Sequence, residues 1–287
     1  MFVAFGVPQL VTPTEVEARA LFPSKLYAPV AGEFPTDPFG DAPWVLGEIA
    51  RRRGLEVPGR LVASAKSWLC HAAVDRSAAI LPWGAEDPSI PRISPVDASA
   101  RVLAHVRRAW DEEFPDEPLA LQEVVLTVPA SFDEVARELT VEAASRAGLP
   151  HLRLLEEPQA AIYAWIAENP DWRARLADHR LVLVVDVGGG TTDFSAIAVR
   201  RLASGLSLER VAVGDHLLLG GDNMDLALAY TIQNKLEDEG KTLDSWQFLS
   251  LVHSSARAKI ALFEDAALSE APIAVPSRGS SLFASTI

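Results

Sequence analysis

The chain has 287 residues, of which 49% are hydrophobic, and its formal net charge is −13. This length accommodates two domains of ordinary size, and the hydrophobic content is that of a folded protein rather than a disordered one. The acidic balance argues against nucleic acids and anionic membranes as partners, since both select basic surfaces. Any phosphate site must therefore be local.

Cysteine use and the N-terminus favour a cytoplasmic protein. Cys70 is the only cysteine, which excludes an intramolecular disulfide and a cysteine metal cluster. The first ten residues, MFVAFGVPQL, lack the basic start and long apolar core of a signal peptide, and no apolar run is long enough to span a membrane. The excess of Arg and Ala over Lys favours a bacterial source.

The N-terminal part predicts short strands joined by loops. Residues 2–11 and 20–30 have the character of strands, and residues 33–43, rich in Pro, Gly and Asp, predict a surface loop. Residues 44–53 predict a strand end that continues into a short helix, which Gly54 would close.

The segment 61–70, LVASAKSWLC, is apolar apart from Lys66 and its serines. A lysine in such a setting either extends its amine out of a helix end or has a chemical role, and the segment alone favours the first. Further on, Ser94 with Asp97 predicts a capped helix, and residues 121–128 predict a buried strand.

The following stretch predicts a helix to residue 147, with Ser131 and Glu134 as its capping box, and then a short strand over residues 152–155. That strand delivers Glu156 and Glu157 directly before a proline that opens the next helix. Two carboxylates at the positive end of a helix are commonly structural, so this corner alone does not establish a catalytic role.

Residues 181–199, LVLVVDVGGGTTDFSAIAV, point to a ligand site. Residues 181–185 are apolar and mostly β-branched, which predicts a strand buried on both faces. The strand ends at Asp186, and the glycines that follow allow a tight turn and close backbone approach to a ligand. The mixed polarity of residues 194–199 predicts a returning strand. A hairpin excludes a Walker loop and a dinucleotide fingerprint, because both open a helix.

The turn of this hairpin offers two kinds of ligand contact. Its N–H groups and the hydroxyls of Thr191 and Thr192 could hold phosphate, and Asp186 and Asp193 could hold a hydrated divalent cation. The alternative is a tight glycine turn between core strands.

The C-terminal third predicts a strand over residues 206–213, a helix opened by Gly220 and Gly221, a second helix over residues 243–263, and a final hairpin over residues 272–287. The first helix would end at Gly240. The glycine pair predicts either a tightly packed strand-to-helix turn or a backbone that approaches phosphate.

Several motifs together resemble the nucleotide-binding domain of the heat shock protein 70 chaperones. DVGGGTTD at residues 186–193 is similar to that family's DLGGGTFD phosphate loop. VPASF at residues 128–132 and LEEPQAAIYAW at residues 155–165 are similar to its VPAYF and NEPTAA motifs, in the same order and at the same separation. GGDNMD at residues 220–225 is similar to its GGEDFD motif, and SSARAKIALF at residues 254–263 to its adenosine-contacting segment.

The resemblance implies an α/β, actin-like ATPase fold with two ribonuclease H-like lobes, lobe I over residues 1–169 and lobe II over residues 170–287. It implies ATP or ADP with Mg²⁺ between the lobes, hydrolysis by water, and unfolded protein clients and co-chaperones as further partners. The family's first phosphate loop and second adenosine motif have no counterpart here. We therefore expect a module incomplete at both ends, with the first two strands and the C-terminal part of lobe II missing, and inactive as an ATPase by itself.

The resemblance also assigns roles to single residues. Lys66 and Glu157 would act on the transition state and the attacking water, Asp186 would hold the metal through water with Asp193 beside it, and Thr191 would complete the catalytic set. Pro129 and Arg137 would relay nucleotide state between domains. The nucleotide-contacting residues would be Gly188, Gly189, Gly190, Thr191, Thr192, Gly220, Gly221, Asp222 and Lys259.

Two alternatives stay open. One is a scaffold or binding protein of the same fold that holds nucleotide weakly, favoured by Ala256 and Phe263, where the family has Glu and Ser. The other is a sugar or acetate kinase of the same superfamily. The chaperone-like VPASF motif and the Glu157–Pro158 pair argue against the kinase.

Overall fold

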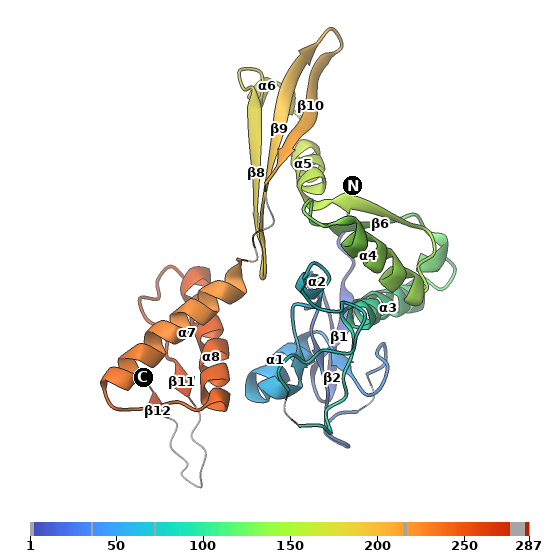
Figure 1. Cartoon of the computed structure of the whole chain (residues 1–287). Helices are drawn as coiled ribbons and strands as arrows, with labels where there is room; N and C mark the ends of the chain where they lie inside the picture. The colour runs from blue at the N-terminus through green and yellow to red at the C-terminus, as the bar shows by residue number, and fades with distance from the viewer. Residues whose placement is uncertain are drawn as a thin grey trace. The chain divides into compact units, whose positions relative to one another are not determined.

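The computed structural model describes residues 3–35, 37–71, 73–85, 87–214, 217, 219–275 and 285–286. Helices and strands are interspersed along the chain, which places the protein in the mixed α/β class (Figure 1). The chain forms two compact units. Unit 1 contains Met1–Ala63, Ile80–Ile93 and Gly220–Ile287, and unit 2 contains Ser64–Ala79 and Ser94–Leu219. The lobe boundary predicted between residues 169 and 170 divides the chain differently from these two units, and it stays a prediction.

Unit 1 begins with a hairpin followed by a small sheet. β1 (Val7–Thr12) pairs antiparallel with β2 (Glu15–Arg19), and β3 (Leu26–Tyr27) lies between β4 (Val45–Leu46) and β5 (Leu61–Val62). Strands therefore occur in both predicted segments, β1 in the first and β3 in the second, but each is shorter than predicted. β2 lies between the two segments, where no strand was predicted. The core here contains Leu10, Tyr27, Val45, Ile49 and Ala50.

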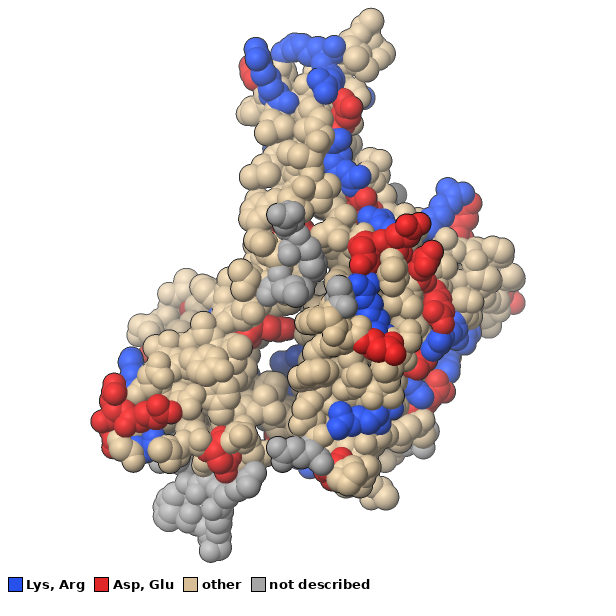
Figure 2. All heavy atoms as spheres, in the orientation of Figure 1, with Lys and Arg blue, Asp and Glu red and all other residues tan. Residues whose placement is uncertain are grey.

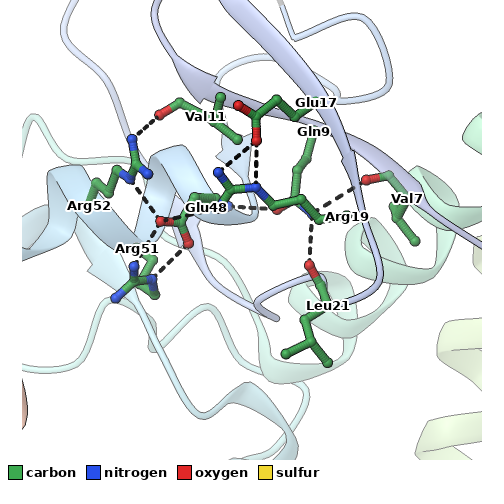
Figure 3. Close-up of polar contacts among 9 residues, drawn as sticks. All are labelled: Val7, Gln9, Val11, Glu17, Arg19, Leu21, Glu48, Arg51 and Arg52. Atoms are coloured by element: carbon green, nitrogen blue, oxygen red, sulfur yellow. Dashed lines mark hydrogen bonds and ion pairs between the residues drawn. The ribbon is translucent and has the colours of Figure 1, made fainter. Parts of the chain in front are cut away.

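Buried polar contacts hold α1 (Glu48–Glu56) against the hairpin (Figure 3). The fully buried side chain of Gln9 accepts a hydrogen bond from the N–H of Glu48 at 3.0 Å and donates one to the carbonyl of Leu21 at 2.9 Å. The first N–H groups of a helix have no intrahelical partner, so Gln9 supplies one. The Glu48 carboxylate contacts Arg51 at 2.7 Å and Arg52 at 2.8 Å.

Gly54 lies inside α1, so the prediction that it closes the helix was wrong. A Cβ at this position would lie 2.6 Å from the Cδ1 of Leu61, so glycine lets β5 approach the helix. The helix instead ends before Pro58, the first residue of the 3₁₀ turn η1 (Pro58–Arg60), because the residue preceding a proline disfavours the α conformation.

The C-terminal part of unit 1 is a helix pair with a short hairpin. α7 (Gly221–Asp238) and α8 (Ser245–Glu264) lie side by side, and Gly240 follows α7 with φ +78°, as predicted for the stop (Figure 1). β11 (Ala274–Val275) pairs with β12 (Ser285–Thr286), which confirms a hairpin, although its residues 276–284 lie outside the described residues. The core here contains Ala229, Leu251 and Val275.

The helices of unit 2 include the short α2 (Ala65–Trp68) and the long α3 (Pro95–Glu113), which packs beside α4 (Glu134–Arg146) (Figure 1). Ser94 caps α3 as predicted, since its Oγ accepts the N–H of Asp97 at 3.0 Å. The core between these helices contains Leu69, Val96, Ala100 and Ala143.

The cap of α4 differs from the prediction. Asp133, not Ser131, accepts the N–H of Ala136, at 2.7 Å. A carboxylate at this position is favoured by the positive end of the helix as well as by the hydrogen bond. Ser131 is therefore free of the capping role and uses its hydroxyl elsewhere, as described below.

A parallel strand pair carries the Glu-Glu corner. β6 (Val124–Val128), which follows the 3₁₀ turn η2 (Leu119–Leu121), pairs with β7 (Leu152–Glu156), and α4 is the crossover between them. The prediction of a buried strand was wrong for most of β6, because only Val128 is buried and Val125 is 55% exposed. α5 (Glu157–Glu168) begins directly after β7.

The antiparallel sheet of unit 2 has β9 (Thr192–Leu202) between β8 (Leu181–Val187) and β10 (Gly205–Val213), which confirms the predicted hairpin and the strand after it. The short helix α6 (Trp172–Arg175) precedes β8. The prediction that β8 is buried on both faces was wrong, because its alternate residues are exposed.

No described helix combines the length and the apolar content needed to cross a membrane. Figure 2 shows acidic and basic side chains interspersed over much of the charged surface on the face drawn.

Candidate functional site

Lys66 and Glu157 are 91 residues apart in sequence, and unit 2 brings them together as an ion pair between Nζ and Oε1. Lys66 lies in α2, just after Ser64, whose φ of +55° is left-handed. Glu157 is the first residue of α5, at the end of β7. The Lys66 side chain is 52% exposed, so its amine remains accessible to a ligand.

The glycine turn between β8 and β9 lies beside α2, the helix that carries Lys66. A Cβ on Gly190 would lie 2.6 Å from the Oγ of Ser67, the neighbour of Lys66. The turn is closed by the N–H of Gly188, which donates to the carbonyl of Thr191 at 2.8 Å. The N–H groups of Gly189, Gly190 and Thr191 have no hydrogen-bond acceptor among the residues that the structure describes. Successive unpaired N–H groups of this kind form an anion-binding concavity.

The two threonines of the turn differ in what they can do. Thr192 donates its hydroxyl to the carbonyl of Leu219 at 2.7 Å and its N–H to the carbonyl of Leu217 at 2.9 Å. Its hydroxyl is therefore already used within unit 2. Thr191 is partly exposed, and its side chain makes no hydrogen bond to the described residues. Thr191 is therefore the better placed of the two for a ligand.

Asp186 and Asp193 are directly paired across β8 and β9, so their side chains leave the same face of the sheet. Asp193 is buried and accepts the hydroxyl of Ser131 at 2.5 Å. Asp186 is partly exposed. Of the two predicted metal-binding carboxylates, Asp186 is the accessible one. Within the described residues, no group of three or more His, Cys, Asp or Glu side chains is placed to hold a metal ion.

The predicted contacts of the C-terminal third lie in unit 1. Gly220 precedes α7 and donates its N–H to the Oδ1 of Asn223 at 2.9 Å. Lys259 in α8 contacts the carboxylate of Asp225 at 2.7 Å and donates to the carbonyl of Gly221 at 2.9 Å. Lys259 therefore joins α8 to the first turn of α7, rather than standing free for a base.

Two titratable groups of unit 1 are strongly affected by burial. Loss of water around Lys25 lowers its pKa, against the opposing attraction of Asp222. Burial also lowers the pKa of His253 to about 4, and the positive charge of Lys25 acts in the same direction. His253 is consequently neutral at pH 7.

A family model described as Hsp70 protein matches residues 73–278. The chain belongs to the Hsp70 family. Curated relatives described as "Chaperone protein HscA homolog" include those of Verminephrobacter eiseniae, 38% identical over 149 residues, Methylibium petroleiphilum, 43% over 136 residues, and Bordetella pertussis, 36% over 179 residues. These matches cover 52%, 47% and 60% of this chain, but only 22%, 20% and 27% of the respective relatives.

Membership of the Hsp70 family confirms the resemblance drawn from the motifs. Sequence reasoning nevertheless missed part of the site. Glu156 was noted only as a neighbour of Glu157, yet its carboxylate contacts Arg137 at 3.1 Å and also pairs with Arg210. Ser67 was not identified as the neighbour of Gly190. No local pattern reveals these contacts, since they join segments far apart in the chain.

Proposed function

We propose that this Hsp70-family chain is a chaperone nucleotide-binding domain of actin-like fold that binds Mg-ATP or Mg-ADP, with lobe I over residues 1–169 and lobe II over residues 170–287. The observation that carries the proposal is the convergence of the Lys66–Glu157 pair and the Gly188–Thr191 turn through the contact of Ser67 with Gly190. This places a positive amine, a carboxylate and a glycine turn in one unit.

The residues present suit a phosphate group. The turn offers the unpaired N–H groups of Gly189, Gly190 and Thr191, and the small size of Gly190 keeps the turn close to α2. Backbone N–H groups together with a lysine amine are the donors that phosphate-binding loops use. The hydroxyl of Thr191 adds a further donor, while Thr192 positions the turn through its bonds to Leu217 and Leu219.

A bound Mg-nucleotide would supply the phosphoanhydride bond that water cleaves in the whole protein. Lys66 would offset negative charge on the phosphate, and Glu157, held by Lys66, would orient the attacking water. Asp186 would hold the hydrated metal, with Asp193 fixed beside it by Ser131. Catalysis of this kind consists mainly of positioning and charge stabilisation.

The remaining predicted residues take supporting roles in the proposal. Gly220, Gly221 and Asp222 at the start of α7, and Lys259 through its contacts with that turn, would form the nucleotide-contacting part of unit 1. Arg137 would relay nucleotide state through Glu156, next to Glu157, with Pro129 at the preceding turn. For the whole protein, we expect a cytoplasmic location and unfolded clients and co-chaperones as partners.

Calorimetric titration with Mg-ADP tests the proposal. Lys66→Met and Gly190→Val should each weaken binding at least tenfold, the first by removing the amine and the second because added carbon would collide with Ser67. Lys235→Met changes an exposed lysine on α7 and serves as the control for loss of charge. Wild-type affinity in a folded Lys66→Met variant would contradict the proposed site.

A second candidate is a scaffold of the same fold that holds nucleotide weakly. It is supported by the ion pair of Lys259 with Asp225. It is also supported by Phe263, which is 81% exposed and stands at a position where the family has a serine. Absence of binding heat with millimolar Mg-ADP and Mg-ATP would favour this candidate. If the wild-type chain releases phosphate from ATP and the Glu157→Ala variant does not, the ATPase would be favoured.

A further inference from the structure

Glu156 carries a carboxylate at the position where the family's NEPTAA motif has a neutral asparagine. It is the N-cap residue of α5, yet its side chain makes no capping hydrogen bond. A polar side chain at an N-cap commonly accepts a free N–H group of the helix. The Glu156 side chain is only 14% exposed, and its carboxylate contacts two arginines instead. Its role therefore depends on what these arginines hold.

The two arginines contact different oxygens of this carboxylate. The Nη2 of Arg137 donates to the Oε1 of Glu156 at 3.1 Å, and the Nη1 of Arg210 contacts the Oε2. A carboxylate that is held through one oxygen can still rotate, whereas contacts to both oxygens fix its plane. Both arginine side chains are partly buried, so water and salt screen these contacts less than at an open surface. Arg210 therefore completes the constraint on Glu156.

Arg210 reaches this corner from β10. It lies directly opposite Ile197 of β9, and Ile197 belongs to the buried face of β9 that also carries Asp193. Since directly opposite residues share one face of a sheet, Arg210 lies on that same face. A β-bulge directly after Arg210 leaves Val211 out of the register with β9. Bulges re-aim side chains and are frequent beside active sites, so the shape of β10 suits the presentation of this arginine.

The contacts of Glu156 bear directly on Glu157, the next residue. A rigid peptide unit joins the two, so the position of the N-cap residue determines where the first residue of α5 lies. That first residue is Glu157, which pairs with Lys66. Arg137 also donates its Nε to the carbonyl of Phe132 at 3.2 Å, which ties the cluster to the turn before α4. A displaced Glu156 carboxylate would therefore displace Glu157 relative to Lys66.

We infer that Arg210 is a positioning residue for Glu157. Together with Arg137 it holds the Glu156 carboxylate, and it thereby fixes the start of α5 so that Glu157 meets Lys66. The inference deepens the proposed function, on which it rests for the role of Glu157 toward water. It gives β10, which carries none of the predicted nucleotide contacts, a part in forming the site. The pairing of Glu157 with Lys66 is present without nucleotide, so it can be measured without nucleotide.

NMR spectroscopy of the methylated chain tests the inference. Reductive methylation with ¹³C-formaldehyde places labelled methyl groups on the lysine amines and keeps their charge, and Lys66→Arg identifies the Lys66 signal. Glu157→Gln gives the signal of a Lys66 amine without its carboxylate partner. Arg210→Met and Glu156→Gln should each move the Lys66 signal most of the way to that position. The double variant should move it no further, since both changes release the same cluster.

Arg200→Met provides the matched control, because Arg200 lies in the same sheet and pairs with Glu209 of β10 at 2.7 Å. It should leave the Lys66 signal in place, and circular dichroism should show which variants are folded. An unmoved Lys66 signal in folded Arg210→Met would overturn the inference, and Glu156→Gln decides in the same way if Arg210→Met does not fold. An equal shift from Arg210→Met in a Glu157→Gln background would also overturn it, because the effect would not pass through Glu157.

Mg-ADP separates this inference from the proposed function. Addition of Mg-ADP should move the Lys66 signal of the wild-type chain, because the amine would meet phosphate. A Lys66 signal that does not respond to Mg-ADP, yet shifts in Arg210→Met, would contradict the nucleotide site and support the positioning role. A Lys66 signal that responds to Mg-ADP but is unmoved in Arg210→Met would contradict the positioning role alone.

Discussion

Lowering the pH from 7 to 5 should destabilise unit 1 through His253 in α8. Burial lowers the pKa of this histidine from 6.5 to about 4, with the positive charge of Lys25 acting in the same direction. The folded state therefore binds the proton more weakly than the unfolded state. Stability contributed by the neutral ring is present above pH 6.5 and is lost as the pH falls toward 4.

The two pKa values set the magnitude. At pH 7 the histidine is mostly neutral in both states, whereas at pH 5 it is mostly protonated in the unfolded state and mostly neutral in the folded state. The free energy of unfolding should therefore fall by about 2 kcal/mol between pH 7 and pH 5. Carboxylates with ordinary pKa values titrate mainly below this range.

Urea unfolding at both pH values, followed by circular dichroism, tests this expectation. His253→Gln replaces the ring with a side chain that does not titrate, so the variant should lose about 2 kcal/mol less than wild type over the same range. His151→Gln, at an exposed position, should behave as wild type. Equal losses in wild type and His253→Gln would refute the reasoning.

Three further outcomes follow, two from unit 1 and one from Cys70 in unit 2. Gly47→Ala should cost at least about 1 kcal/mol of unfolding free energy, because φ is +75° and a Cβ would lie 2.5 Å from a phenylalanine ring carbon. Gly59→Ala is the control, because the space around Gly59 is open, and it should leave the free energy of unfolding nearly unchanged. An unchanged free energy for Gly47→Ala in urea unfolding would contradict the geometry. Burial raises the pKa of Cys70 to about 12, so iodoacetamide should alkylate it at pH 8 at least tenfold more slowly in the folded chain than in urea; equal rates would argue against its burial. Hydrogen bonding to Arg51 lowers the pKa of Glu48 to about 2, so its contribution of about 3 kcal/mol is present above pH 4.5 and disappears as the pH falls toward 2. Glu48→Gln should flatten the acid part of the stability profile, and an unchanged acid dependence would show that this carboxylate is not responsible.

The sequence by itself determined the local elements and the family. The hairpin over residues 181–199 follows from an apolar run, three glycines and a returning strand, all within one short segment. Ser94 and Gly240 marked a helix start and a helix stop, because capping depends on groups within a few residues of one another. The Hsp70 motifs were also recognisable, since each is a short run whose order along the chain carries the information.

Only the tertiary structure decided which of these residues meet and which are buried. Lys66 and Glu157 pair across 91 residues of sequence, and Ser131 donates to Asp193 while Asp133 takes the helix cap. The exposure of β8 could not be predicted from its composition, because an apolar strand is buried on both faces only when neighbouring elements cover it. Burial and long-range pairing are properties of the packed chain, so a local pattern can name the groups of a site without placing them together.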